Sequence, residues 1–161
     1  MTSTGLWPAL GTPYAHPAVA ATTPLAGVLA PRAHWSPADL HRLTRAFTTR
    51  AAADLHRAAR FDPAARWRLL LARSGQVEVW LVTWTPGQSS SWHEHGTAAA
   101  YTVLDGELTE TRPHGRTGTR ATRRRPGRGA AAGPGHLHTL QNLGVLPAIS
   151  VHAMLTGPGP R

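Results

Sequence analysis

Trp92-His93-Glu94-His95-Gly96 is the stretch around which the rest of the chain is organised. In an extended strand, successive side chains point to opposite faces, so His93 and His95 project together while Glu94 points away. Neutral imidazole is a common ligand for first-row transition metals. The pair therefore indicates a metal site, although two polar surface residues remain the alternative in a chain with ten histidines.

Length and composition set limits on what this site can be. The 161 residues, 41% of them hydrophobic, suit one folded domain with a core. The chain has no cysteine, which excludes disulfides, thiolate metal sites and a cysteine nucleophile. A metal must therefore be held by nitrogen or oxygen. No arginine precedes Arg32, and prolines interrupt the apolar stretch before it, so we expect a soluble cytoplasmic protein without a signal peptide or membrane span.

The net charge of +9 comes from arginine alone, since all seventeen basic residues are Arg. Together with abundant Ala, Gly and Pro, this indicates GC-rich coding bias more than selection for phosphate binding. Seven arginines fall within residues 112–128, in a run without interleaved aromatics that predicts a solvated loop. Nucleic-acid binding is the disfavoured alternative. It would require a salt-dependent affinity that falls when Arg123, Arg124 and Arg125 are replaced.

The N-terminal third of the chain predicts helices. Residues 1–35 are rich in Ala and Pro and are expected to be irregular, with a short helix near residues 25–29. Ser36-Pro37-Ala38-Asp39 then has the residues of a helix start. An apolar stripe at helical spacing follows and ends at Asp62-Pro63, with Thr48-Thr49 as a candidate break. These helices are expected to pack on a sheet and to carry no chemistry.

From Trp67 onward the pattern predicts strands. The expected strands cover residues 67–72, 77–84, 101–104, 107–110, 137–141 and 147–155, with the His93-x-His95 strand between the second and the third. Asp105-Gly106 separates two of them and predicts a hairpin. The chain is therefore expected to be mainly β, a small barrel with helices packed outside, as one domain over residues 36–155 followed by a tail at 156–161.

A second group of polar residues lies near the C-terminus. His138 follows a Gly/Pro turn, and Ser150, His152 and Met154 alternate along the last strand, so they share one face. Two histidines from one strand and one from a distant strand would leave positions open for substrate and oxygen, a variant of the non-haem iron facial arrangement. The alternatives are that His136 and His138 are exposed beside a turn and that His152 is a core residue.

These motifs resemble those of a known family. Gly87-(x5)-His93-x-His95 with Gly106 is similar to the first cupin motif, and Gly135-x-x-His138-x3-Asn142 is similar to the second. Ala99 and Ala100 stand where many cupins carry an acid. With the stretches 84–88, 103–110 and 147–152, this pattern over residues 35–155 resembles the cysteine dioxygenase type I family, including its bacterial thiol dioxygenases. The resemblance implies a cupin barrel, a double-stranded β-helix or jelly roll, with the N-terminal helices packed outside.

The resemblance also implies a site and a reaction. His93, His95 and His138 would hold Fe(2+), and Arg68, with Arg66 as a competitor, would bind the substrate carboxylate. Ser150 and His152 match two members of a Ser-His-Tyr relay. L-cysteine and O2 would give cysteine sulfinate. The expected partners are a small-molecule thiol and O2, with no membrane and with nucleic acid disfavoured, and the expected state is a monomer or a weak homo-oligomer.

Two departures from the family pattern bear on activity. Met154 stands in place of the relay Tyr, and a thioether has no acidic proton to donate. Ala100 replaces a crosslinking cysteine, an absence shared with bacterial relatives, while the adjacent Tyr101 is expected to point to the other face. The alternatives are therefore a metal-binding cupin with no catalysis or an altered substrate, and a 3-mercaptopropionate dioxygenase, which Arg68 disfavours.

Overall fold

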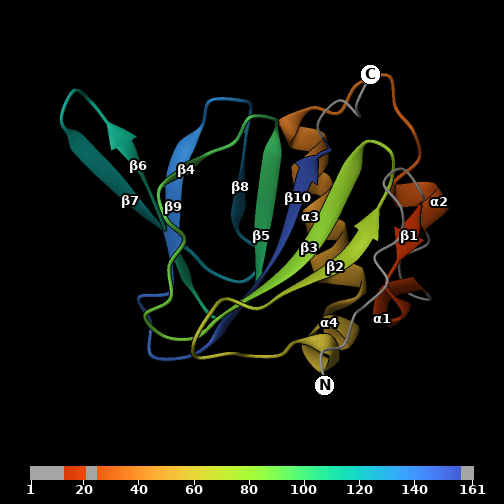
Figure 1. Cartoon of the computed structure of the whole chain (residues 1–161), viewed down its shortest axis with the longest axis horizontal. Helices are drawn as coiled ribbons and strands as arrows, with labels where there is room; N and C mark the ends of the chain where they lie inside the picture. Colours follow the sequence, from red (N-terminus) through yellow and green to blue (C-terminus); the bar gives the residue numbers. More distant parts are fainter. Residues whose placement is uncertain (1–12, 21–24, 157–161) are drawn as a thin grey trace.

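The strands of the protein form two antiparallel sheets, as seen in a computed structural model that describes residues 13–20 and 25–156 (Figure 1). The larger sheet has the strand order β1 (Tyr14–Ala15), β2 (Arg68–Arg73), β3 (Val77–Trp84), β10 (Ala148–Leu155), β5 (Ala99–Asp105) and β8 (Gly129–Ala132). The smaller sheet has the order β4 (His93–Glu94), β9 (Leu137–Gln141), β6 (Leu108–His114) and β7 (Gly118–Arg124). Neighbouring strands far apart in sequence, such as β3 and β10, show that the sheets are built by crossovers.

The described helices are α1 (Pro17–Ala20), α2 (Leu25–Val28), α3 (Pro37–Arg50) and α4 (Ala52–Ala58). α3 begins where the sequence predicts it. The Ser36 hydroxyl accepts a hydrogen bond from the Asp39 amide at 3.2 Å, and the Asp39 carboxylate accepts one from the Ser36 amide at 2.9 Å. This reciprocal pair satisfies two amides that have no partner within the helix, which explains why the helix starts there.

The predicted break at Thr48-Thr49 is displaced to Ala51. Both threonine hydroxyls donate to the Arg45 carbonyl inside α3, so these residues remain helical. None of the described helices has the length and hydrophobicity that crossing a membrane requires.

α3 packs on the outer face of the larger sheet, against β5 and β10 (Figure 1). Leu40, Phe47 and Leu55 have no exposed surface and form part of a core shared with that sheet. Burying side chains of this size stabilises the fold by roughly 1.5–3 kcal/mol each. A second apolar cluster, which includes Trp84 and Leu108, lies between the two sheets and supports the site described below.

The N-terminal segment is more ordered than the sequence predicts. The helix expected near residues 25–29 is present as α2, but β1 and α1 occupy part of a stretch predicted to be irregular. β1 pairs with β2, and Val19 and Trp35 are buried in the core. Residues 1–12 and 21–24, and the predicted tail apart from Thr156, lie outside the described residues. The division into segments at 35 and 155 stays a prediction.

The predicted hairpin at Asp105-Gly106 is wrong. β5 pairs with β10 and β8, whereas β6 pairs with β7 and β9, so this turn carries the chain from one sheet to the other. Gly106 has φ +71°, and a Cβ there would lie 2.5 Å from the Pro147 carbonyl oxygen. Glycine is required at this position because two chain segments pass close to one another there, and not because the turn forms a hairpin.

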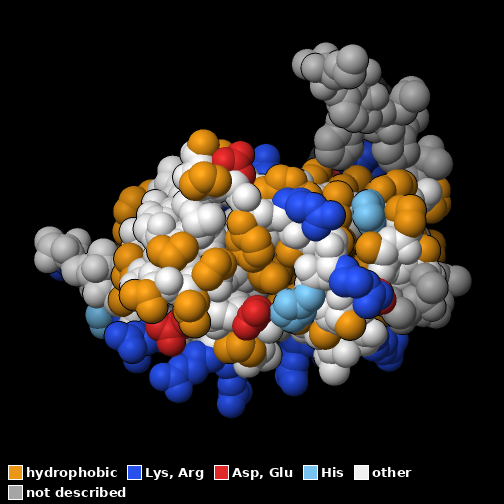
Figure 2. Space-filling model, turned by 90° about the horizontal axis from the view of Figure 1, so that it is seen from below, with side chains coloured by type: hydrophobic (Ala, Val, Ile, Leu, Met, Phe, Trp, Pro, Cys, Tyr) orange, Lys and Arg blue, Asp and Glu red, His pale blue; other side chains and the backbone are white. Residues whose placement is uncertain are grey.

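The arginine-rich run is also not the loop that the sequence predicts, because β6 and β7 form a long hairpin through it and β8 follows. On its surface, Arg123 and Arg125 lie 3.7 and 3.3 Å from the Glu107 carboxylate. Figure 2 shows basic side chains gathered along one edge of the face in view, while much of that face is apolar or uncharged. The positive charge of this hairpin is therefore partly matched by acids.

Candidate metal centre and catalytic pocket

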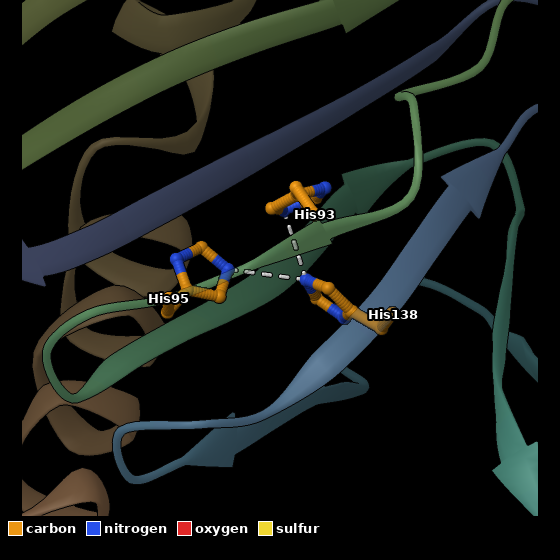
Figure 3. Close-up of side chains that lie close together, drawn as sticks. All are labelled: His93, His95 and His138. Carbon is orange, nitrogen blue, oxygen red and sulfur yellow. Dashed lines mark hydrogen bonds between the residues drawn. The ribbon is translucent and has the colours of Figure 1, made fainter.

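Three histidines predicted as metal ligands converge in the structure (Figure 3). His93 on β4 pairs directly with His138 on β9, and His95 follows the end of β4. The Nε2 atom of His138 lies 3.1 Å from Nε2 of His93 and 3.1 Å from Nε2 of His95. Two strands distant in sequence thus present three imidazole nitrogens to one point.

The hydrogen bonds on the far side of the rings fix which nitrogen carries the proton. Nδ1 of His93 lies 2.9 Å from the Ser91 carbonyl oxygen, and Nδ1 of His138 lies 2.9 Å from the Glu110 carboxylate. Both partners only accept, so both Nδ1 atoms carry hydrogen and the Nε2 atoms of the neutral rings expose lone pairs. Two lone pairs facing each other repel, and a shared cation removes that repulsion. The donor set therefore fits a metal ion held by nitrogen.

Burial keeps the third imidazole neutral as well. Desolvation, followed by the neighbouring His138 and His93, lowers the pKa of His95 to about 4. A ligand nitrogen must be unprotonated to bind a metal, so His95 needs no proton removed at neutral pH.

Glu110 supports this centre through a hydrogen bond with His138. It was not identified as a site residue from the sequence. Its side chain is fully buried and accepts hydrogen bonds from His138, from Arg112 at 2.7 Å and from Arg124 at 2.9 Å. Burial alone raises the pKa of Glu110, but these three donors outweigh it and hold the pKa well below its usual range. The sequence signal for this role is an acid at an inward position of β6, among arginines that neutralise it.

A second group of possible ligands, Glu110, His136 and His138, overlaps the first. The alternative that His136 is exposed beside a turn does not hold, because His136 is half-buried. Its Nε2 lies 3.6 Å from the Glu110 carboxylate. In this group, the Nδ1 proton of His138 is already donated to Glu110. The group of His93, His95 and His138 therefore offers the better set of free lone pairs.

Ser150 and His152, predicted from their spacing on the last strand, are connected in the structure. The Ser150 hydroxyl lies 2.8 Å from Nε2 of His152 and 2.9 Å from the indole nitrogen of Trp84. Indole nitrogen only donates, so Ser150 accepts from Trp84 and is free to donate to His152. Desolvation, followed by His138 and His95, lowers the pKa of His152 to about 3, which keeps the ring neutral. The ring hydrogen of His152 is then on Nδ1.

The expectation that Tyr101 points away from the site is wrong. Tyr101 lies directly opposite His152 in the β5–β10 pair, and the two rings stack with centroids 5.5 Å apart. Residues opposite each other on neighbouring strands share a face, whereas Ala100 pairs with Ala153 and faces the helices. The Tyr101 hydroxyl is buried near Glu110 and Arg124, and burial, followed by Glu110, raises the pKa of Tyr101.

A cavity of about 460 Å³ is lined by the three histidines and by His152, while Ser150 is buried behind His152 and does not line it. Met154 lines it, in agreement with its position on the face of Ser150 and His152. The sequence offers Arg66 and Arg68 as alternatives for binding the substrate carboxylate, and both line the cavity. Their guanidinium carbons lie over indole rings, 4.9 Å from the Trp84 centroid for Arg66 and 5.8 Å from that of Trp80 for Arg68.

Asn142, part of the second predicted motif, does not line the cavity. Its side-chain amide donates to the carbonyls of Trp84 and Leu146, and its oxygen accepts from the Gly144 amide. The role of Asn142 is to close the turn between β9 and β10.

Solved structures confirm the fold. The chain is 28% identical to the TT1209 protein from Thermus thermophilus, with a TM-score of 0.56 over 65% of this chain and 95% of that one. A protein with a double-stranded β-helix domain from Klebsiella pneumoniae is 24% identical, with a TM-score of 0.56 over 66% of this chain and 90% of that one. A cupin superfamily protein from Desulfitobacterium hafniense is 17% identical, with a TM-score of 0.53 over 79% and 94%.

These likenesses confirm the predicted mainly β cupin barrel with helices packed outside. No curated protein matches the sequence. The sequence profile described as cysteine dioxygenase type I matches residues 32–158, which contain α3, α4, the strands from β2 to β10 and the histidine cluster. The chain belongs to the cysteine dioxygenase type I family.

Proposed function

We propose that the protein is a non-haem iron thiol dioxygenase and that L-cysteine, the substrate to which its family points, is converted to cysteine sulfinate. In this reaction, a thiol RSH and O2 give the sulfinic acid RSO2H. The S–H and O–O bonds break, two S–O bonds and one O–H bond form, and sulfur loses the four electrons that dioxygen gains. The partners are therefore one small thiol and O2, and the proposed location is the cytoplasm.

One observation carries the proposal. Three Nε2 atoms from His93, His95 and His138 converge beside a cavity in a chain of this family. Three neutral imidazoles accept several divalent ions, so the choice of Fe(2+) comes from the family rather than from the donor set. A ferrous ion held there would supply open positions for a thiolate and for dioxygen.

The chain's own residues supply binding and proton positions. Arg68 is proposed to bind the substrate carboxylate, because a planar guanidinium matches a carboxylate with two parallel hydrogen bonds. Ser150 donates to Nε2 of His152 and so keeps the ring hydrogen of His152 on Nδ1. Trp80 and Trp84 form an aromatic part of the cavity wall.

Met154 supports a second candidate, a cupin that binds metal without oxidising thiols. It lines the cavity where the family has a tyrosine, and its thioether cannot donate a hydrogen bond. This candidate keeps the metal centre and predicts no oxygen consumption.

The test is oxygen uptake by protein loaded anaerobically with ferrous iron, with cysteine, 3-mercaptopropionate or cysteamine as substrate. We expect uptake with cysteine and one sulfinate formed per O2. His93→Ala should abolish uptake and lower the iron content, while His114→Ala, which changes an exposed histidine of β6, should leave both unchanged. Stoichiometric iron with no uptake on any thiol would instead establish the non-catalytic cupin.

A further inference from the structure

Two arginines face the cavity without an acidic partner. Arg66 and Arg68 form no ion pair with any carboxylate in the described part of the chain. Their guanidinium groups lie over the rings of Trp84 and Trp80, which supply apolar contact but no negative charge. Both cations are therefore available to a ligand.

The acids in the cavity wall are already matched by other arginines. Glu78 pairs with Arg73 at 2.8 Å and also accepts from the Trp80 indole at 3.1 Å. Glu110 is matched by Arg112 and Arg124. Neither acid is left to neutralise the two cavity arginines, so the cavity carries an excess of positive charge before any metal binds.

The two guanidinium groups also act on one another. Desolvation, followed by the charge of Arg68, lowers the pKa of Arg66. Arg66 and Arg68 are both largely exposed, so solvent screens much of this repulsion, and an anion bound beside both guanidinium groups would remove the rest. A ligand with one carboxylate can satisfy one planar guanidinium with two hydrogen bonds, and a second carboxylate is needed to satisfy the other in the same way.

We propose that Arg66 and Arg68 form a paired anion subsite, so that the cavity binds a thiol with two carboxylates in preference to a thiol with one. As a statement about substrate, this keeps the dioxygenase reaction of the proposed function and rests on it, but it places a thiol with two carboxylates ahead of L-cysteine; the subsite itself can be tested without turnover. Arg66 and Arg68 are then two parts of one site rather than competitors for one role.

The first experiment measures binding to the metal-free full-length protein by calorimetry, with succinate and propionate as probes. The two differ by one carboxylate and lack a thiol. In the unaltered protein we expect succinate to bind at least about tenfold more tightly than propionate. Equal affinity for the two acids would overturn the subsite, whatever the variants do.

Single-arginine variants test which residues cause the preference for succinate. Arg66→Gln and Arg68→Gln should each remove most of the preference for succinate. Arg116→Gln removes the same charge from the exposed β6–β7 turn and should leave the preference intact. A preference that survives in both cavity variants, or falls equally in Arg116→Gln, would overturn the assignment and indicate attraction to net charge alone.

The second experiment separates this inference from the proposed function. Iron-loaded protein is given mercaptosuccinate or 3-mercaptopropionate, which differ by one carboxylate. We expect kcat/KM to be about tenfold or more higher for mercaptosuccinate, and the ratio to fall toward one in Arg66→Gln. Oxygen uptake with cysteine but no advantage of mercaptosuccinate over 3-mercaptopropionate or of succinate over propionate would keep the function and overturn the subsite. No uptake on any thiol, with the succinate preference intact, would keep the subsite and overturn the dioxygenase.

Discussion

Nδ1 of His138 lies 2.9 Å from the carboxylate of Glu110, a side chain with no exposed surface. The carboxylate fixes the ring orientation and leaves Nε2 as the lone pair that faces the other two histidines. Arg112 and Arg124 keep Glu110 ionised, so the hairpin formed by β6 and β7 supports the metal centre through Glu110 in the cavity wall.

Glu110→Gln should weaken metal binding while retaining the shape of the side chain. A neutral amide holds His138 less strongly and leaves Arg112 and Arg124 unmatched, so we expect the affinity for Fe(2+) to fall by roughly 10–100-fold. Competition with a chromophoric chelator measures this without turnover. Glu107→Gln removes an acid that pairs with exposed arginines and serves as the matched control. Equal affinities in the two variants would contradict the role of Glu110.

Ser150→Ala should lower turnover without removing the metal. The variant leaves the Trp84 indole and Nε2 of His152 without their shared partner, both in buried surroundings. We expect a loss in unfolding free energy of about 1–3 kcal/mol, measured by denaturant titration, together with a lower kcat. Iron stoichiometry should stay at the level of the unaltered protein. If kcat is unchanged, the Ser150–His152 pair has no part in the reaction.

Met154→Tyr should raise turnover with cysteine. The residue lines the cavity on the face of Ser150 and His152, so a phenol there adds a hydroxyl donor beside the proposed centre. Met154→Phe has a ring of similar size without the hydroxyl and is the control. Steady-state oxygen uptake compares the three proteins. Turnover in the Tyr variant no higher than in the Phe variant would argue against a relay that includes position 154.

Gly106→Ala should destabilise the fold more than Gly87→Ala. Both glycines have positive φ, +71° and +85°, and an alanine in that region costs roughly 1–2 kcal/mol. A Cβ at position 106 would also meet the Pro147 carbonyl and Ala148, whereas nothing lies within 4 Å of one at position 87. Thermal unfolding of the two variants measures the difference. Equal losses would show that the turn relaxes away from Pro147.

Local features of the fold are predictable from the sequence. Ser36 and Asp39 determine the start of α3, because the hydrogen bonds that cap it join residues three apart. β3 and β9 have the bounds that the sequence predicts, since apolar runs between turn residues are local signals. The histidine pair was found in the same way, because alternation along an extended chain places His93 and His95 together.

The tertiary structure alone decided how the strands pair and what the site contains. Asp105-Gly106 has the local signal of a hairpin, yet β5 and β6 belong to different sheets. Tyr101 faces the cavity because its place opposite His152 is set by strand register, and Glu110 reaches His138 for the same reason. Hydrogen bonds within a turn or a helix start depend on neighbours in the chain. Strand pairing and buried ion pairs depend on residues far apart in sequence, whose contacts form only when the whole barrel closes.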